Sequence, residues 1–160
     1  MITLNFDDYY LVAVYVPNSG EGLRRLQYRV DEWDQHFFNY LKKLKRKKDV
    51  IVTGDFNVAH GLLDIYDPNG KEKQPGFTQE ERDSFQGLLD YGYVDTFRKL
   101  NPQKKEFTFW ANRSKARETN SGWRLDYFLV SERLSQSVEE TAILKDYLGS
   151  DHCPIKLVLN

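Results

Sequence analysis

Residues 50–57, Val-Ile-Val-Thr-Gly-Asp-Phe-Asn, join a short apolar run to a polar end. The run 50–53 predicts a short strand buried at a central position of a sheet. Gly54 lets the backbone turn tightly at the strand end. Asp55 and Asn57 then project from the same side of an extended segment, two residues apart.

This polar end has a chemical and a structural interpretation. A carboxylate such as Asp55 can accept a proton from water, and a neighbouring amide such as Asn57 can donate to that water or to a phosphate oxygen. Gly, Asp and Asn are also the commonest residues where a strand simply leaves a sheet. Taken alone, the stretch favours the structural interpretation.

The residues before this stretch predict a hairpin and a helix. Residues 2–6 and 9–16 read as two strands around an Asp7-Asp8 turn, ended by the loop cluster 17–20. Apolar residues then recur at steps of three and four, which predicts one helix from 22 to 47. They are Leu23, Leu26, Val30, Trp33, Phe37, Leu41 and Leu44. The basic residues at 42–48 indicate either a solvated helix end, which we favour, or a DNA-binding patch.

The residues after it predict one more helix and four strands. Thr78 and Glu81 form a capping box that opens the helix, after a long loop. Strand-like segments follow at 106–110, 123–131, 140–145 and 153–159. Strands that alternate with helices predict an α/β or layered α+β fold in a single domain, 1–160.

Composition narrows the class of protein. The chain has 160 residues, 40% of them apolar and 14% aromatic, which is enough for a real core. A net charge of −1 says little, because a basic rim can surround an acidic centre. The single cysteine, Cys153, cannot pair within the chain, so we expect a reducing compartment. No membrane-length apolar run or signal-peptide order occurs, so we expect a soluble, intracellular protein with no membrane partner.

A second polar cluster lies at Ser150-Asp151-His152. An imidazole can donate to a non-bridging phosphate oxygen in the transition state. Asp151 and His152 would point to opposite faces of a strand, so another carboxylate must orient the ring, and Asp126 is the candidate. Asp151 stays free for a metal or for the nucleophilic water. The alternative is a turn with a surface histidine, but two such sets in one chain favour the chemical interpretation.

Five blocks along almost the whole chain look like those of one known family. They lie at 15–18, 54–60, 76–78, 120–127 and 149–154. On these blocks the chain resembles the exonuclease III type of abasic-site (AP) endonuclease, within the endonuclease/exonuclease/phosphatase superfamily. The pieces at 54–57 and 150–152 recur across the superfamily, whereas 57–60 and 122–127 look specific to the abasic-site branch.

The resemblance implies a fold and a reaction. The fold would be part of the four-layer α/β sandwich of the DNase I-like fold, without its N-terminal strands. The reaction would be hydrolysis of the phosphodiester 5′ to an abasic site in duplex DNA, leaving a 3′-hydroxyl, as part of DNA repair. Mg²⁺ would be the cofactor, with Mn²⁺ as the alternative ion. The compartment would be the nucleus in a eukaryote, and the cytoplasm or nucleoid in a prokaryote.

Catalytic roles follow from the resemblance, position by position. Asp55 would activate the attacking water, and Asn57 would position that water and contact the phosphate. His152 would bind the scissile phosphate, with Asp126 holding its ring. Tyr15 would contact the phosphate or steady the leaving group.

Substrate-binding and metal roles follow in the same way. Asp151, with Asp55 and Asn57, would bind the metal, and Asn18 would line the phosphate site. An apolar pocket for the extruded, baseless sugar would be formed by Phe109, Trp123 and Leu125. For Phe109 and Trp123, simple core packing is an equally good interpretation. Backbone phosphates would be contacted by a basic loop with Arg113, Lys115 and Arg117.

The resemblance covers only the second half of the family's domain. The family's first half supplies the glutamate that is the principal metal ligand, and strands of one of its two sheets. We therefore expect the C-terminal portion of such a domain, weak or inactive alone, with an exposed sheet face that pairs with a missing N-terminal half or a second chain. Alternatives are a non-catalytic fragment that binds DNA or a partner, or another phosphodiesterase of the superfamily, such as a retrotransposon endonuclease, a DNase I-like nuclease or a phosphoinositide phosphatase.

Overall fold

A five-stranded sheet forms the centre of the computed structural model, which describes residues 1–112 and 115–160. Its strands are β1 (Ile2–Asn5), β2 (Tyr9–Tyr15), β3 (Asp49–Asp55), β4 (Tyr93–Asp95) and β5 (Asp126–Ser131), in the order β1-β2-β3-β5-β4. Strands β2 and β3 are parallel, and the other neighbours are antiparallel. The predicted hairpin and the predicted central strand are confirmed.

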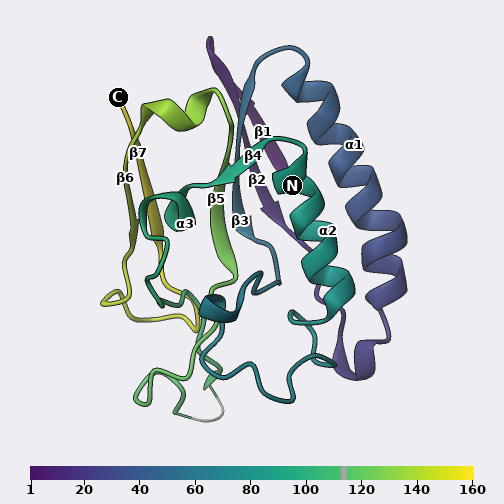
Figure 1. Ribbon diagram of the computed structural model, residues 1–160, viewed down its shortest axis with the longest axis vertical. Coiled ribbons are helices and arrows are strands. Elements are labelled where there is room, and N and C mark those ends of the chain that lie inside the picture. Colours follow the sequence, from purple (N-terminus) through teal and green to yellow (C-terminus); the bar gives the residue numbers. More distant parts are fainter. Residues whose placement is uncertain (113–114) are drawn as a thin grey trace.

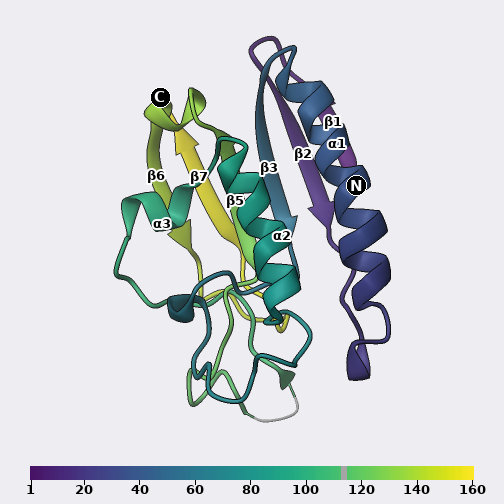
Figure 2. The same cartoon turned by 45° about the vertical axis from the view of Figure 1, so that its right-hand side comes forward.

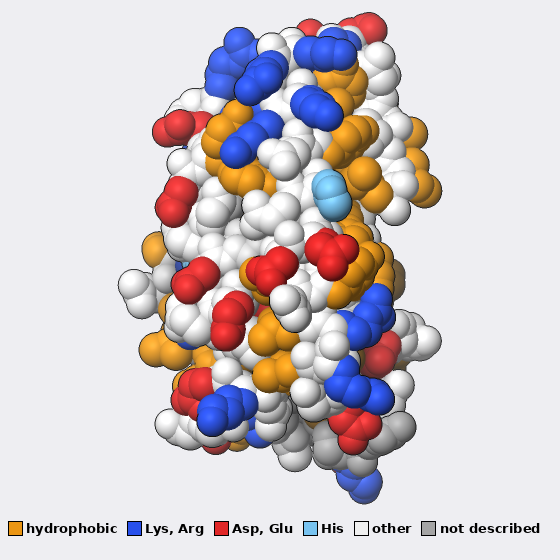
Figure 3. All heavy atoms as spheres, turned by 90° about the vertical axis from the view of Figure 1, so that its right-hand side faces the viewer, with side chains coloured by type: hydrophobic (Ala, Val, Ile, Leu, Met, Phe, Trp, Pro, Cys, Tyr) orange, Lys and Arg blue, Asp and Glu red, His pale blue; other side chains and the backbone are white. Residues whose placement is uncertain are grey.

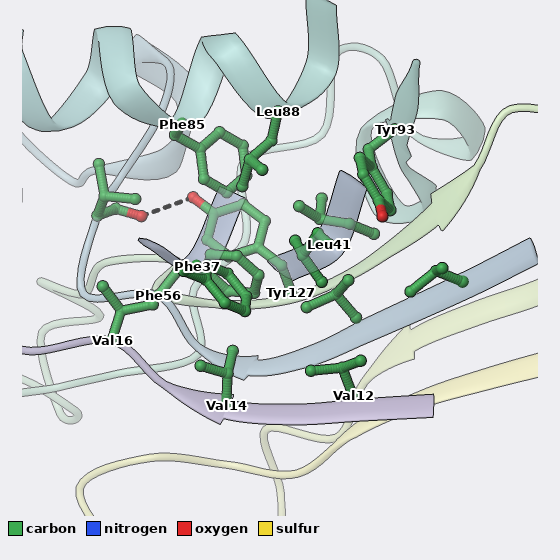
Figure 4. Packing of buried hydrophobic residues seen from close by; sticks show 14 residues of the cluster. Val12, Val14, Val16, Phe37, Leu41, Phe56, Phe85, Leu88, Tyr93 and Tyr127 are labelled. Carbon is green, nitrogen blue, oxygen red and sulfur yellow. Dashed lines mark hydrogen bonds between the residues drawn. The ribbon is translucent and has the colours of Figure 1, made fainter. Parts of the chain in front are cut away.

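Two helices cover one face of this sheet, as Figures 1 and 2 show. They are α1 (Asp34–Lys45) and α2 (Gln79–Asp90), and α2 begins at the predicted capping box of Thr78 and Glu81. Apolar side chains from both helices meet those of the central strands in one buried cluster (Figure 4). Within the described ranges, no helix is long and apolar enough to span a bilayer.

The remaining elements lie beside β5. A two-stranded antiparallel sheet is formed by β6 (Val138–Ile143) and β7 (Ile155–Leu159), and α3 (Thr96–Leu100) packs next to β6. Cys153, only 5% exposed, packs in a small cluster with Phe107 and Trp110. This mixed α/β arrangement is the predicted fold class.

Two predicted strands differ from the structure. Residues 106–110 do not form a strand; Phe109 makes only isolated bridges with Trp123 and His152, because the chain here crosses between two other segments. The long predicted strand 123–131 begins only at Asp126. The short β4 and α3 were not predicted, because three to five residues are too few to show a period.

The predicted helix 22–47 is regular only from Asp34 onward. Gly22 and Leu23 have φ of 65° and 59°, which interrupt a helix, and a π-helix occupies Tyr28–Trp33. The wider π-turn changes which side chain faces inward. Arg29 is therefore buried although it lies outside the predicted apolar stripe, and Val30 of that stripe is half-buried.

The basic residues at the end of α1 gather at one end of the molecule, at the top of Figure 3. Part of this charge is used within the fold. The Nζ of Lys45 donates to the carbonyl oxygens of Tyr91 and Gly92, each at 2.7 Å, and Lys48 donates to that of Phe6. These contacts support the interpretation as a helix end.

Candidate active site

Three polar side chains form a row across neighbouring strands, at one end of the strands. Tyr15 on β2 is the register partner of Asp55 on β3, and Asp55 is the register partner of Asp126 on β5. Side chains in register on adjacent strands project from the same face. The loops that follow β2 and β3 gather below these strand ends in Figures 1 and 2.

Asp126 is in contact with His152, as predicted. The Nδ1 of His152 lies 2.8 Å from Oδ2 of Asp126. This hydrogen bond raises the pKa of His152, burial opposes the rise, and the negative charges of Asp126, Asp55 and Asp151 add to it. Since an ionised carboxylate only accepts, Nδ1 carries hydrogen and Nε2 is the ring nitrogen left to meet a ligand.

Asp55 and Asn57 meet through a turn, and not on an extended segment as predicted. The backbone N–H of Asn57 donates to Oδ1 of Asp55 at 2.8 Å, and its Nδ2 donates to Oδ2 at 3.1 Å. Asn57 has φ of 48°, a left-handed conformation that asparagine tolerates better than most residues. The turn arises because an Asp side chain readily accepts from the backbone two residues on.

The amide of Asn57 has protein partners on every side. Nδ2 also donates to the carbonyl oxygen of Val16 at 2.9 Å, and Oδ1 accepts from Nδ2 of Asn18 at 2.9 Å. Both amide hydrogens are therefore used within the protein. This arrangement favours a role for Asn57 in holding Asp55 in place.

Burial is the main cause that raises the pKa of Asp55 to about 6. The hydrogen bond from Asn57 opposes this rise, the negative charge of Asp126 adds to it, and His152 and Arg29 lower it. Asp55 is therefore ionised above pH 6 and holds a proton more strongly than an exposed carboxylate does. Those properties suit a group that takes a proton from water near neutral pH.

Gly54 does not form the tight turn that was predicted for it. It lies inside β3 with φ of 132°, so it does not turn the chain away from the sheet. A Cβ at this position would lie 1.9 Å from the carbonyl oxygen of Val14. Glycine is required because β2 approaches closely at the end of the strand pair.

A cleft of about 420 Å³ lies at this row, and it is lined by Tyr15 and Asp55 but not by Asp126. Eight of the predicted site residues line it: Tyr15, Asn18, Asp55, Asn57, Phe109, Trp123, Leu125 and His152. Gln74, Pro75, Gly76 and Ala111 also line it and were not predicted. Three of these belong to the long loop before α2, where composition indicated a loop and carried no sign of which residues face a ligand.

The apolar wall of the cleft is also part of the core. The Phe109 ring lies 4.9 Å from the His152 ring, and Trp123 meets Phe77 edge to face at 6.2 Å. Phe109 and Trp123 are partly buried and pack against a buried cluster that includes Leu125 and Phe77. Phe109 and Trp123 therefore both line the cleft and pack against the core.

The predicted basic loop is described in part. Arg113 lies outside the described residues, and Lys115 is exposed with Glu118 at 3.9 Å. Arg117 donates to the carbonyl oxygens of Lys145 and Ser150, and its guanidinium stacks 4.4 Å from the Trp110 ring. Arg117 therefore holds the segment that leads to His152, and contact of this loop with backbone phosphates stays a prediction.

The predicted metal ligands do not form a complete set. Among residues 1–112 and 115–160, no three His, Cys, Asp or Glu side chains cluster closely enough to hold an ion. Asp151 lies beside His152, with its Oδ1 3.3 Å from the Ser150 hydroxyl, and does not share the cleft wall with Asp55. Mg²⁺ prefers near-octahedral oxygen ligands, and Asp55 and Asp151 alone do not provide them.

The helix-covered sheet has a cleft at its strand ends, where a carboxylate lies near a histidine–aspartate pair, and these features define a class of α/β proteins with titratable groups gathered at the strand ends. A family model described as the Endonuclease/Exonuclease/phosphatase family matches residues 2–152, and the chain belongs to this family.

Relatives with known names resemble the whole chain. It is 47% identical to a DNA-(apurinic or apyrimidinic site) endonuclease of Dictyostelium discoideum, with 100% of this chain and 45% of that protein aligned. It is 42% identical to an exodeoxyribonuclease of Bacillus subtilis (strain 168), with 100% and 64% aligned. The crystal structure of the AP endonuclease LMAP from Leishmania major superimposes with a TM-score of 0.88 at 37% identity, covering 96% of this chain and 51% of that one. The chain thus spans about half the length of the relatives it matches.

Proposed function

We propose that the chain carries catalytic residues of a DNA-repair endonuclease, at the ends of its central strands. This enzyme would hydrolyse the phosphodiester 5′ to an abasic site in duplex DNA. The observation that carries the proposal is the row of Tyr15, Asp55 and Asp126 at a cleft, with His152 held by Asp126. The names of the Dictyostelium and Leishmania relatives, both AP endonucleases, support this substrate.

The proposed reaction is one-step attack of water on the scissile phosphate. Asp55 takes the proton of the water, and the turn with Asn57 fixes the direction of its carboxylate. His152, held through Nδ1, donates from Nε2 to a phosphate oxygen and offsets the charge that grows in the transition state. Tyr15, 62% exposed at the cleft, steadies the leaving 3′ oxygen.

Substrate selection would depend on shape. Phe109, Trp123 and Leu125 form an apolar wall that a sugar without a base can approach closely. A nucleotide with its base would have to displace these packed side chains, at a cost of several kcal/mol, on the order of the penalty for disrupting a well-packed core. Asn18 would line the phosphate site next to them.

Mg²⁺ remains the proposed cofactor, and Asp55, Asn57 and Asp151 are the side chains that would hold it. Because these residues do not form a complete ligand set, water and DNA phosphate oxygens would have to supply the remaining ligands. The ion would provide positive charge at the phosphate when bound. Weak affinity for Mg²⁺ in the absence of DNA is expected.

A polypeptide partner is proposed for the open face of β1 and β2. Thr3 contacts Tyr40 of α1, whereas Ile2 and Leu4 point to the other face and are 66% and 48% exposed. Tyr15 extends this apolar face on β2. The proposed occupant is the segment that corresponds to the first half of the longer relatives, supplied in trans, and sedimentation of the mixed polypeptides tests it.

The experiment is incubation of the purified chain with Mg²⁺ and duplex DNA that carries one synthetic abasic site. Cutting only 5′ to the lesion, leaving a 3′-hydroxyl, supports the proposal, whereas cutting elsewhere indicates another phosphodiesterase. Binding without cutting, also after the first half is added in trans, refutes catalysis. In an active preparation, Asp55→Asn should lower kcat by about 10³-fold or more, since it removes the proton acceptor and keeps the shape.

A further inference from the structure

An enclosed ion pair lies beneath the cleft. Nη1 of Arg29 is 2.9 Å from Oε1 of Glu81, and the two residues are 2% and 0% exposed. Burying two charges costs several kcal/mol unless their remaining donors and acceptors are also satisfied. The partners of this pair therefore indicate what it does.

Arg29 binds the backbone of the turn that follows Asp55, the proposed base. Its Nη1 donates to the carbonyl oxygen of Asn57, and its Nη2 to that of Phe56, each at 2.7 Å. These two carbonyls flank the left-handed residue Asn57, a conformation that costs about 1 kcal/mol or more unless its surroundings hold it. The planar fork of the guanidinium can hold both carbonyls and Glu81 at once, which an ammonium group cannot.

Glu81 accepts hydrogen bonds from two further loops. Its Oε2 accepts from the backbone N–H of Gly76 at 2.7 Å, and its Oε1 accepts from the hydroxyl of Ser19. Gly76 lines the cleft, and Ser19 directly follows Asn18, which also lines it. The pair thus connects three loops, 18–20, 56–57 and 74–78, and each loop supplies part of the cleft wall.

The capping box of α2 explains only part of this arrangement. It requires Glu81 to accept from the backbone N–H of Thr78, which it does at 3.1 Å. The contacts with Gly76, Ser19 and Arg29 lie outside the box. A glutamate needed only for the helix end would not have to be buried or paired with an arginine.

We propose that Arg29 and Glu81 are positioning residues, which fix the three loops of the cleft relative to Asp55 from behind. The catalytic consequence rests on the proposed function, whereas the order of the loops is a property of the free protein. The two parts can therefore be tested separately.

The first test is hydrogen exchange of the free protein. Arg29→Lys keeps the charge but not the fork, and Glu81→Gln keeps the size but not the charge. Arg29→Lys should speed exchange at Asn57 and Gly76 by about tenfold or more, and Glu81→Gln mainly at Gly76 and Thr78. The control is Lys45→Met, which removes two carbonyl contacts at the other end of the sheet and should leave these amides unchanged. Wild-type exchange at all three loops in Arg29→Lys would overturn the proposal.

A second variant, Arg29→Ala, separates a loss of positioning from a general loss of folding. Arg29 borders a cavity of about 180 Å³ between α1 and α2, so guanidinium at a non-denaturing concentration can enter the space left by Arg29→Ala. Guanidinium, but not sodium, should restore slow exchange at Asn57. Equal effects of the two ions would contradict a positioning role.

The kinetic test uses an active preparation with abasic duplex DNA. Arg29→Lys should lower kcat by about tenfold or more and change KM by less than about threefold, since the side chains that face DNA are kept. A rise in KM alone would refute the catalytic part. A wild-type chain that cuts no abasic DNA would refute the proposed function, and the exchange experiment would still decide the positioning role.

Discussion

Asp55 and Asp126 are register partners across β3 and β5, yet only Asp126 touches the imidazole of His152. The backbone and side-chain amides of Asn57 hold the other carboxylate. The two acids on adjacent strands therefore have different partners and different roles. Asp126 orients a histidine, and Asp55 can accept a proton.

Asp126→Asn should lower the pKa of His152 toward its ordinary value of about 6.5, because the hydrogen bond to Asp126 is the largest cause of its elevation. Titration of the imidazole resonances by NMR measures this. His60 is the internal control, since burial lowers its pKa and Asp126 is not among the causes. An unchanged His152 titration would show that the contact does not persist in solution.

Asp55→Asn should change the pH dependence of stability. The pKa of Asp55 is higher in the folded chain, about 6, than in the unfolded one, so its contribution to stability is present below pH 4 and is lost as pH rises through 6. Relative to the variant, the wild-type free energy of unfolding should fall by at most about 3 kcal/mol between pH 4 and pH 8. Urea unfolding at both values checks this, and parallel curves would contradict a buried, high-pKa carboxylate.

In an active preparation, the rate of incision should follow a bell-shaped curve. It should rise through pH about 6 as Asp55 loses its proton, and fall above the raised pKa of His152 as the ring loses the proton it donates. Asp126→Asn should move the alkaline limb to lower pH. A rate that is flat from pH 5 to 7 would remove Asp55 from the role of base.

Gly54→Ala should prevent close pairing of β2 and β3, because its Cβ would collide with the carbonyl oxygen of Val14. We expect a loss of about 3 kcal/mol or more in the free energy of unfolding, measured by urea denaturation. Gly87→Ala, in α2 with open space around its Cβ, is the matched control and should stabilise the chain by up to about 1 kcal/mol. Equal effects of the two substitutions would contradict the close approach at Gly54.

Local patterns in the sequence predicted much of the fold. Apolar runs marked the central strand, and the box of Thr78 and Glu81 marked the start of α2. The argument that adjacent residues point to opposite faces correctly assigned Asp126, and not Asp151, to His152. In the first two cases the cause lies within a few residues of its effect, and in the third the exclusion of Asp151 depends only on its being adjacent to His152.

Features that depend on distant partners were missed. Arg29 is buried because its guanidinium donates to carbonyl oxygens 27 and 28 residues away and to Glu81, so an apolar stripe could not identify it. Asn57 is left-handed because its amide meets Asp55, Val16 and Asn18 together. Glu81 gave a cap signal and no sign of its second role.

The position of Cys153 next to His152 has a practical consequence. Burial raises the pKa of its thiol to about 11, so only about one thiol in 10⁴ is ionised at pH 7. Maleimide dyes will therefore label the chain only in molecules where this segment has detached from Phe107 and Trp110. Because Cys153 is the only thiol in the sequence, the native chain reports by itself how often the segment next to His152 detaches from the fold.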